Sequence, residues 1–278
     1  MSKYSAIPPL NAEAALKRFN LHADKSLGQN FLQDHAVLEK IALTADIQDD
    51  DAVLEIGPGL GNLTRYLSVS AREVIAVELD SQLLAPLEAV LAPYKNVRIV
   101  HGDILKTRIS ELIHKPDYLV AANIPYYITS ALIRHLLESE IKPRRVVLTI
   151  QKEVAERICA KAGDLSLLAL SVQVYGKPAI TARIPAGAFH PAPKVDSAIL
   201  RIDIYKEPLI PHELLKTFFK FIKAGFSQKR KTLRNALSSG LHISPKEAEA
   251  LLTSAGVDHM RRAETLNIEE WKGLCEKS

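Results

Sequence analysis

The sequence predicts an α/β fold, in which a mostly parallel, doubly wound sheet has helices on both faces and is followed by a small all-α domain. Three observations indicate this fold. Apolar runs rich in Val, Ile and Leu alternate with segments of helical spacing through the first two hundred residues. A glycine-rich turn follows the first run. After residue 208 only helical patterns continue.

Five apolar runs predict buried parallel strands, because a strand covered on both faces has a near-continuous hydrophobic sequence. The segments between them place apolar residues at helical spacing, so the repeating order is strand, helix, strand. The predicted strands are 52–57, 73–80, 97–103, 117–123 and 145–151.

Two later runs alternate more strictly, "AITARIP" at 179–185 and "SAILRIDIY" at 197–205, and predict strands that close the sheet edge. In the helical tail, "SPKEAEALLTSAG" at 244–256 offers a serine cap, a proline at the first helical position and a glycine stop. We therefore predict two domains, 1–207 and 208–278.

The composition is that of an ordinary folded protein, with 47% hydrophobic and 24% charged residues among 278. No apolar run approaches the roughly 20 residues of a membrane helix, and the amino terminus lacks the apolar core of a signal peptide. Cys159 and Cys275 are far apart and indicate neither a metal site nor a disulfide framework. We expect a cytoplasmic protein without a metal.

The positive charge is concentrated in the tail. The net charge is +4; residues 209–278 hold 12 basic and 8 acidic residues, and the preceding residues hold 24 of each. A basic cluster beside Phe221 and Phe226 predicts a phosphate-contacting surface. A solvated helix face is the alternative that the charge run alone leaves open. The cluster consists of Lys223, Lys229, Arg230, Lys231 and Arg234.

The segment "LEIGPGLGNLT" at 54–64 places Gly57, Gly59 and Gly61 in the turn from the first strand into a helix. Missing side chains there let a ligand approach backbone N–H groups closely. The turn resembles the dinucleotide-binding turn, but its spacing is G-x-G-x-G with a proline inside, and Glu55 precedes the first glycine by two residues. The turn alone does not specify a ligand.

Polar residues stand at the ends of the next strands: Glu78, Asp103 and Asn123. In an open parallel sheet, ligands bind at the carboxyl ends of the strands, so we expect these residues to meet the glycine turn. A carboxylate after the second strand can accept hydrogen bonds from ribose hydroxyls, and one after the third from an adenine amino group. Each acid alone would be a solvated loop residue, but their order favours an adenosyl ligand.

This order of residues resembles the class I S-adenosylmethionine-dependent methyltransferases, which have a Rossmann-like fold. From about residue 20 to the C-terminus, eight segments in order look like the rRNA adenine N6,N6-dimethyltransferases, the KsgA family. They are "KSLGQNFL", "EIGPGLGNLT", "VELD", "GDIL", "NIPYY", "FHPAPKVDSAIL", "FSQKRKTLRNAL" and "RAETLNIEEW".

The resemblance implies S-adenosylmethionine as the cofactor. It implies that Asn30 and Leu32 contact this cofactor, together with Gly57, Gly59, Glu78, Asp103 and Asn123. It also implies that Phe189 lies on one face of the target adenine, with Tyr126 on the other.

The segment "NIPYY" at 123–127 suits attack by an adenine amino group, whose lone pair is delocalised into the ring. The side-chain carbonyl of Asn123 and the backbone carbonyl beside Pro125 can accept the amino hydrogens as the nitrogen becomes pyramidal. Tyr126 can stack on a base drawn out of its helix. If the glycine turn were absent upstream, the favoured interpretation of this segment would be a strand that ends at a proline and is followed by two packed tyrosines.

The resemblance implies dimethylation of two adjacent adenosines in the 3′-terminal hairpin of small-subunit (16S) rRNA, within a partly assembled 30S subunit, during ribosome biogenesis. We expect no obligate protein partner and no membrane contact. One alternative is a large-subunit rRNA methyltransferase of the macrolide-resistance type. Another is a non-catalytic ribosome-assembly factor with the same fold.

Overall fold

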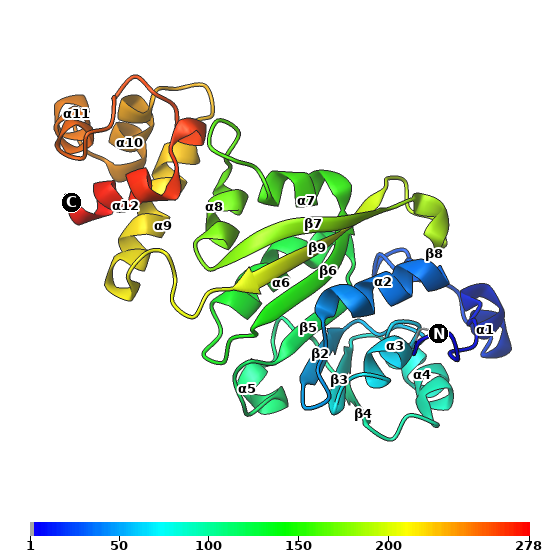
Figure 1. The fold of residues 1–278 in the computed structure, drawn as a ribbon. Coiled ribbons are helices and arrows are strands. Elements are labelled where there is room, and N and C mark those ends of the chain that lie inside the picture. The colour runs from blue at the N-terminus through cyan, green and yellow to red at the C-terminus, as the bar shows by residue number, and fades with distance from the viewer. Residues whose placement is uncertain (1–2) are drawn as a thin grey trace. The chain divides into compact units, whose positions relative to one another are not determined.

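The computed structural model describes residues 3–278 and forms two compact units (Figure 1). The first comprises the chain up to Ala155 with Ala179–Ile204, and the second Glu156–Pro178 with Tyr205–Ser278. The structure thus groups residues 156–178 with the C-terminal helices and not, as the sequence placed them, with the first domain. The physical reason is packing: α8 (Leu167–Gln173) contacts α9 (His212–Phe226), and Tyr175 stacks on Phe219 with ring centroids 6.2 Å apart.

The main sheet confirms the predicted fold class. Within residues 3–278 it has seven strands in the order β4-β3-β2-β5-β6-β9-β7. The strands from β2 to β6 pair in parallel, whereas β9 runs antiparallel to β6. The two late strands therefore close one edge, as predicted. The bounds are β2 (Ala52–Ile56), β3 (Glu73–Glu78), β4 (Val97–His101), β5 (Leu119–Asn123), β6 (Arg145–Gln151), β7 (Gly176–Ile184) and β9 (Ser197–Ile204).

The chain order reverses at the centre of this sheet. From β2 the chain moves outward through β3 to β4, and then returns to pair β5 with the other side of β2. Loops diverge at such a reversal and leave a crevice at the carboxyl ends of the strands. The helices of this unit are α1 (Ala12–Arg18), α2 (His35–Ala45), α3 (Thr64–Ser68), α4 (Leu84–Leu91), α5 (Ile109–Leu112) and α6 (Thr129–Leu137), and α7 (Lys152–Ile158) begins in it.

The segment before α1 packs along α3, which the sequence did not predict. Tyr4 and Ser70 share a hydrogen bond of 2.9 Å between hydroxyl oxygens, and Arg65 Nη1 donates to the Pro8 carbonyl at 2.7 Å. A short strand, β1 (Phe31–Leu32), pairs antiparallel with β8 (Phe189–His190). This pairing joins two loops that lie far apart in the sequence.

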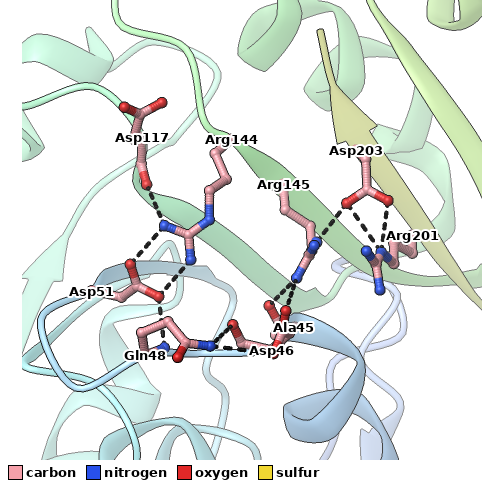
Figure 2. Close-up of polar contacts among 9 residues, drawn as sticks. All are labelled: Ala45, Asp46, Gln48, Asp51, Asp117, Arg144, Arg145, Arg201 and Asp203. Carbon is pink, nitrogen blue, oxygen red and sulfur yellow. Dashed lines mark hydrogen bonds and ion pairs between the residues drawn. The ribbon is translucent and has the colours of Figure 1, made fainter. Parts of the chain in front are cut away.

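An ion network ties the amino end of β6 to neighbouring segments (Figure 2). Arg144 donates to both carboxylate oxygens of Asp51, at 2.8 and 2.7 Å. Arg145 donates to Asp203 at 2.6 Å and to Asp46 at 3.0 Å. Burial raises the pKa of Asp51, but the Arg144 hydrogen bonds and charge outweigh it and hold that pKa below its usual range. Burial likewise raises the pKa of Asp203, but hydrogen bonds from Arg145 and Arg201 outweigh it and hold that pKa below its usual range.

The second unit is helical except for the first residues of β7. Besides α8 and α9 it contains α10 (Leu233–Leu241), α11 (Pro245–Ser254) and α12 (Ile268–Glu276). The predicted start of α11 is confirmed, because Ser244 and Glu247 form a capping box ahead of Pro245. Trp271 is fully buried in this unit. None of the helices described within residues 3–278 combines the length and the hydrophobicity of a membrane span.

Candidate active site

A cavity of about 200 Å³ lies at the carboxyl ends of the central strands. Its walls come from the glycine turn after β2, the ends of β3 and β4, the segment after β5, and residues 27–32. All the predicted catalytic and cofactor residues line this one cavity. These are Asn30, Leu32, Gly57, Gly59, Glu78, Asp103, Asn123, Pro125, Tyr126 and Phe189.

The glycine turn contributes open space to the cavity, and the N–H groups of its three glycines are bonded within the chain. Gly57, Gly59 and Gly61 all have positive φ, from +58° to +84°. Their N–H groups donate within the chain, to Val77 O, Glu78 Oε2 and Pro58 O, each at 2.9 Å. These three N–H groups are therefore occupied within the chain, and close approach of a ligand to the turn stays a prediction. A Cβ on Gly59 would lie 3.0 Å from the Phe31 ring, whereas one on Gly57 would meet nothing within 4 Å.

Glu78 is only 5% exposed and is held from both sides. Its Oε2 accepts from Gly59 N at 2.9 Å, and its Oε1 accepts from Asp80 N at 2.8 Å. Burial raises the pKa of this carboxyl, and the two backbone hydrogen bonds oppose that rise. A carboxylate oxygen can accept more than one hydrogen bond, so Glu78 retains capacity for ligand hydroxyls.

Asp103 is positioned by the turn after β4. Its Oδ1 accepts from Leu105 N at 3.0 Å, and its Oδ2 lies 3.4 Å from the exposed ammonium of Lys106. The aspartate is half-buried and lines the cavity. It can therefore accept a hydrogen bond from a ligand amino group.

The side-chain amide of Asn123 has a defined orientation. Its Nδ2 donates to the backbone carbonyl of Asn30 at 3.0 Å. Because a carbonyl can only accept, the nitrogen must face Asn30, which leaves Oδ1 as an acceptor. The Asn30 side chain in turn donates to Gly28 O at 2.9 Å. Asn30 thus orients Asn123 through its backbone, a role that the sequence did not reveal.

The two aromatic residues of the predicted sandwich both line the cavity but differ in their exposure and in their contacts. Tyr126 is half-buried, and its hydroxyl shares a 2.7 Å hydrogen bond with Ser197 Oγ. Burial raises the pKa of Tyr126, and the Ser197 hydrogen bond opposes that rise. Phe189 is 4% exposed, pairs with Leu32 across β8 and β1, and belongs to the hydrophobic core. Its ring therefore has a packing role as well as a place in the cavity wall.

A family model described as "Ribosomal RNA adenine dimethylase" matches residues 20–276. The chain belongs to the ribosomal RNA adenine dimethylase family. It is thus a methyltransferase with a class I fold.

Relatives within this family include two proteins named "Ribosomal RNA small subunit methyltransferase A". The one from Dehalococcoides mccartyi strain 195 is 48% identical over 96% of this chain and 93% of its own length. The one from Alkaliphilus metalliredigens is 40% identical over 98% of this chain and 97% of its own length.

Solved structures with the same fold include the 23S rRNA methyltransferase ErmE, which is 30% identical with a TM-score of 0.72 and covers 89% of this chain and 99% of its own. A dimethyladenosine transferase from Plasmodium falciparum is 27% identical with a TM-score of 0.76 and covers 88% of this chain and 95% of its own.

This adenine dimethylase family member also has a cavity residue to which the sequence assigned no role, Glu55 on β2. It is 1% exposed, and burial raises its pKa to about 8. Its Oε2 has no hydrogen-bond partner among the described residues. Glu55 was noted only for its spacing from Gly57, because an acid within a strand run gives no sign of how deeply it is buried.

The basic cluster lies in the second unit. Lys223 is exposed on α9, and Lys229, Arg230 and Lys231 are exposed in the loop before α10. Arg234 instead forms an ion pair with Glu249 at 3.0 Å, so part of its charge is compensated. The neighbouring rings belong to the core, because Phe221 is buried and Phe226 packs against Trp271 with ring centroids 6.1 Å apart.

Proposed function

We propose that this protein transfers methyl groups from S-adenosylmethionine to the N6 atoms of two adjacent adenosines in the 3′-terminal hairpin of small-subunit rRNA. The single observation that carries the proposal is the Asn123 amide, whose oxygen is left as an acceptor in the same cavity as Glu78 and Asp103. The relatives named for the small subunit, at 48% and 40% identity, support this substrate over that of ErmE, at 30%.

The cavity suits the proposed cofactor. Space at Gly57 is open where any side chain would project, and the buried Glu78 offers a carboxylate to ribose hydroxyls. We infer that Asp103 accepts from the adenine amino group of the cofactor, and that Asn30 and Leu32 contact the cofactor from the amino-terminal side. When bound, S-adenosylmethionine supplies an electrophilic methyl group on its sulfonium.

In the proposed mechanism, Asn123 Oδ1 and a backbone carbonyl accept the two hydrogens of the target amino group. Pro125 O already accepts from Ile128 N at 3.2 Å, so the second acceptor is the carbonyl that precedes the Pro125 ring, that of Ile124. These two acceptors favour a pyramidal nitrogen whose lone pair points at the methyl group. As the nitrogen–carbon bond forms, the sulfur–methyl bond would break and S-adenosylhomocysteine would leave. The methylated nitrogen would then release a proton to water, and a second S-adenosylmethionine would supply the second methyl group.

The aromatic side chains bind the target base in this proposal. Tyr126 stacks on one face, with its hydroxyl held by Ser197, and Phe189 closes the other face. Stacking offsets part of the cost of drawing a nucleotide out of its helix. The exposed cations Lys223, Lys229, Arg230 and Lys231 supply phosphate contacts, to which Arg234 adds less because of Glu249.

The test is incubation of the protein with labelled S-adenosylmethionine and small subunits that lack the modification. We expect label in dimethyladenosine at the 3′-terminal hairpin, located by mapping of the modified nucleotides. Label in large-subunit rRNA would support the macrolide-resistance type of activity. Binding to the subunits without transfer would support a non-catalytic assembly factor, which the oriented amide of Asn123 argues against.

A further inference from the structure

Tyr127 lines the cavity, yet it is 62% exposed and has no part in the mechanism above. We propose that Tyr127 is the stacking platform for the nucleobase next to the target adenosine, and thereby an RNA-binding residue. This inference rests on the proposed function, because it takes an adenosine in single-stranded RNA as the occupant of the cavity.

The backbone separates the two tyrosines. Residues Tyr126–Ile128 form a 3₁₀ helix, closed by the Ile128 N–H bond to Pro125 O. With three residues per turn, consecutive side chains diverge by about 120°. Tyr126 is fixed towards Ser197 on β9, and Tyr127 lies instead against the turn at Gly28. One tyrosine is therefore available for the target base and the other for a different base.

A hydrogen-bonded turn packs against the Tyr127 ring. Gly28 has φ +64°, and a Cβ on it would lie 3.5 Å from two ring carbons of Tyr127. The Gly28 N–H donates to Lys25 O at 3.1 Å, and Asp24 Oδ1 accepts from both Ser26 N and Ser26 Oγ at 2.7 Å. Because this support exists before any ligand binds, a base that stacks on the exposed part of the ring orders little additional protein.

The chemistry of this surface matches an unpaired nucleobase flanked by phosphates. A base drawn out of its helix leaves its neighbour without a stacking partner, and an aromatic ring replaces that partner whatever the base. Lys25, in the same turn as Gly28, is exposed and can contact the phosphates of the RNA backbone. In the proposed substrate the neighbour is the second adenosine. Its face stays open after N6 methylation, so the platform accepts either form.

The first experiment compares Tyr127→Ala and Tyr127→Phe. Affinity for an RNA hairpin with two adjacent adenosines is measured by fluorescence anisotropy, and KM and kcat are measured with unmethylated small subunits. We expect Tyr127→Ala to weaken hairpin binding, or to raise KM, by about 5- to 150-fold. Tyr127→Phe should match the wild type, because the ring is kept. The control is Leu43→Ala, which removes a 55% exposed apolar side chain from α2. Wild-type affinity and KM in Tyr127→Ala would overturn the inference.

The second experiment replaces each of the two adenosines in turn by an abasic nucleotide, in the hairpin and in reconstituted subunits. The abasic substitution at the adenosine that stacks on Tyr127 should weaken wild-type binding as much as Tyr127→Ala weakens binding of the intact RNA. Combining that abasic RNA with Tyr127→Ala should bring no further loss. Losses that multiply would overturn the stacking contact, as would a weaker affinity of Tyr127→Ala for S-adenosylmethionine in calorimetry. If the wild type fails to methylate subunits, the proposed function itself fails; if it succeeds and Tyr127→Ala behaves like it, only this inference fails.

Discussion

At the scale of single residues, the site depends on which atoms are left to accept hydrogen bonds. The Asn123 oxygen is available because its nitrogen is bound to Asn30 O. Glu78 differs, since both of its oxygens already accept from backbone N–H groups. Backbone atoms thus set the orientation of the Asn123 amide and the position of the Glu78 carboxylate. These atoms remain in place when neighbouring side chains are replaced.

Replacing Asn123 by Ala should slow methyl transfer far more than it weakens RNA binding. The lost acceptor is proposed to act in the transition state, where removal of one such group costs about 10²- to 10³-fold in rate. Asn123→Asp is the matched variant, because it keeps an acceptor but cannot donate to Asn30 O. Single-turnover rates at saturating substrate, beside equilibrium RNA binding, check this. Equal losses in rate and binding would indicate a structural role.

Glu55 should make stability depend on pH. Burial raises its pKa from 4.5 to about 8, so the folded state keeps this proton over a range in which the unfolded chain has lost it. The free energy of unfolding should therefore fall between pH 4.5 and 8, by up to about 1.4 kcal/mol per pH unit, and level off above that range. Urea unfolding of wild type and Glu55→Gln from pH 5 to 9 isolates this group; parallel curves would contradict the assignment.

At the scale of elements, the Arg145 network in Figure 2 should stabilise the junction of β6, β9 and the end of α2. The arginine is 13% exposed and binds Asp203, Asp46 and the Ala45 carbonyl. Arg145→Ala should lower the free energy of unfolding by about 1–3 kcal/mol, since the aspartates stay partly in water. The control is Lys17→Ala, which removes an exposed ion pair with Glu13 and should cost far less, because solvent screens such a pair. Similar costs in urea titrations would refute this role.

The sequence predicted the elements better than their contacts. The apolar runs located β2 to β6, and the alternation of apolar and polar residues located β7 and β9. This worked because the burial of a strand determines which of its neighbouring residues are apolar. The Ser197 partner of Tyr126 and the Asn30 carbonyl behind Asn123 were not foreseeable. Those contacts join residues 71 and 93 positions apart, and no local pattern encodes such distances. The burial of Phe221 was missed because the sequence alone does not show which face of the helix a ring beside cations occupies.

At the scale of the whole molecule, RNA affinity and cofactor affinity should separate. Replacing Lys229, Arg230 and Lys231 by Ala should weaken subunit binding and flatten its salt dependence by about 0.7–0.9 logarithmic units per lost contact. Cofactor affinity should not change, because the cavity is lined by residues of the first unit alone. The matched control is Arg234→Ala, whose smaller expected effect reflects its pair with Glu249. Titrations between about 50 and 200 mM salt decide this; an unchanged slope would leave the cluster a solvated surface.

The pairing of β1 with β8 can form only late in the synthesis of the chain. Phe31 and Leu32 emerge early from the translating ribosome, while their partners His190 and Phe189 emerge only after most of the chain has been made. Until then, the cavity lacks the wall that Phe189 provides. A nascent chain that ends before residue 189 is therefore expected to have the parts that hold the cofactor without the part that closes over the base, and full activity arrives late in translation.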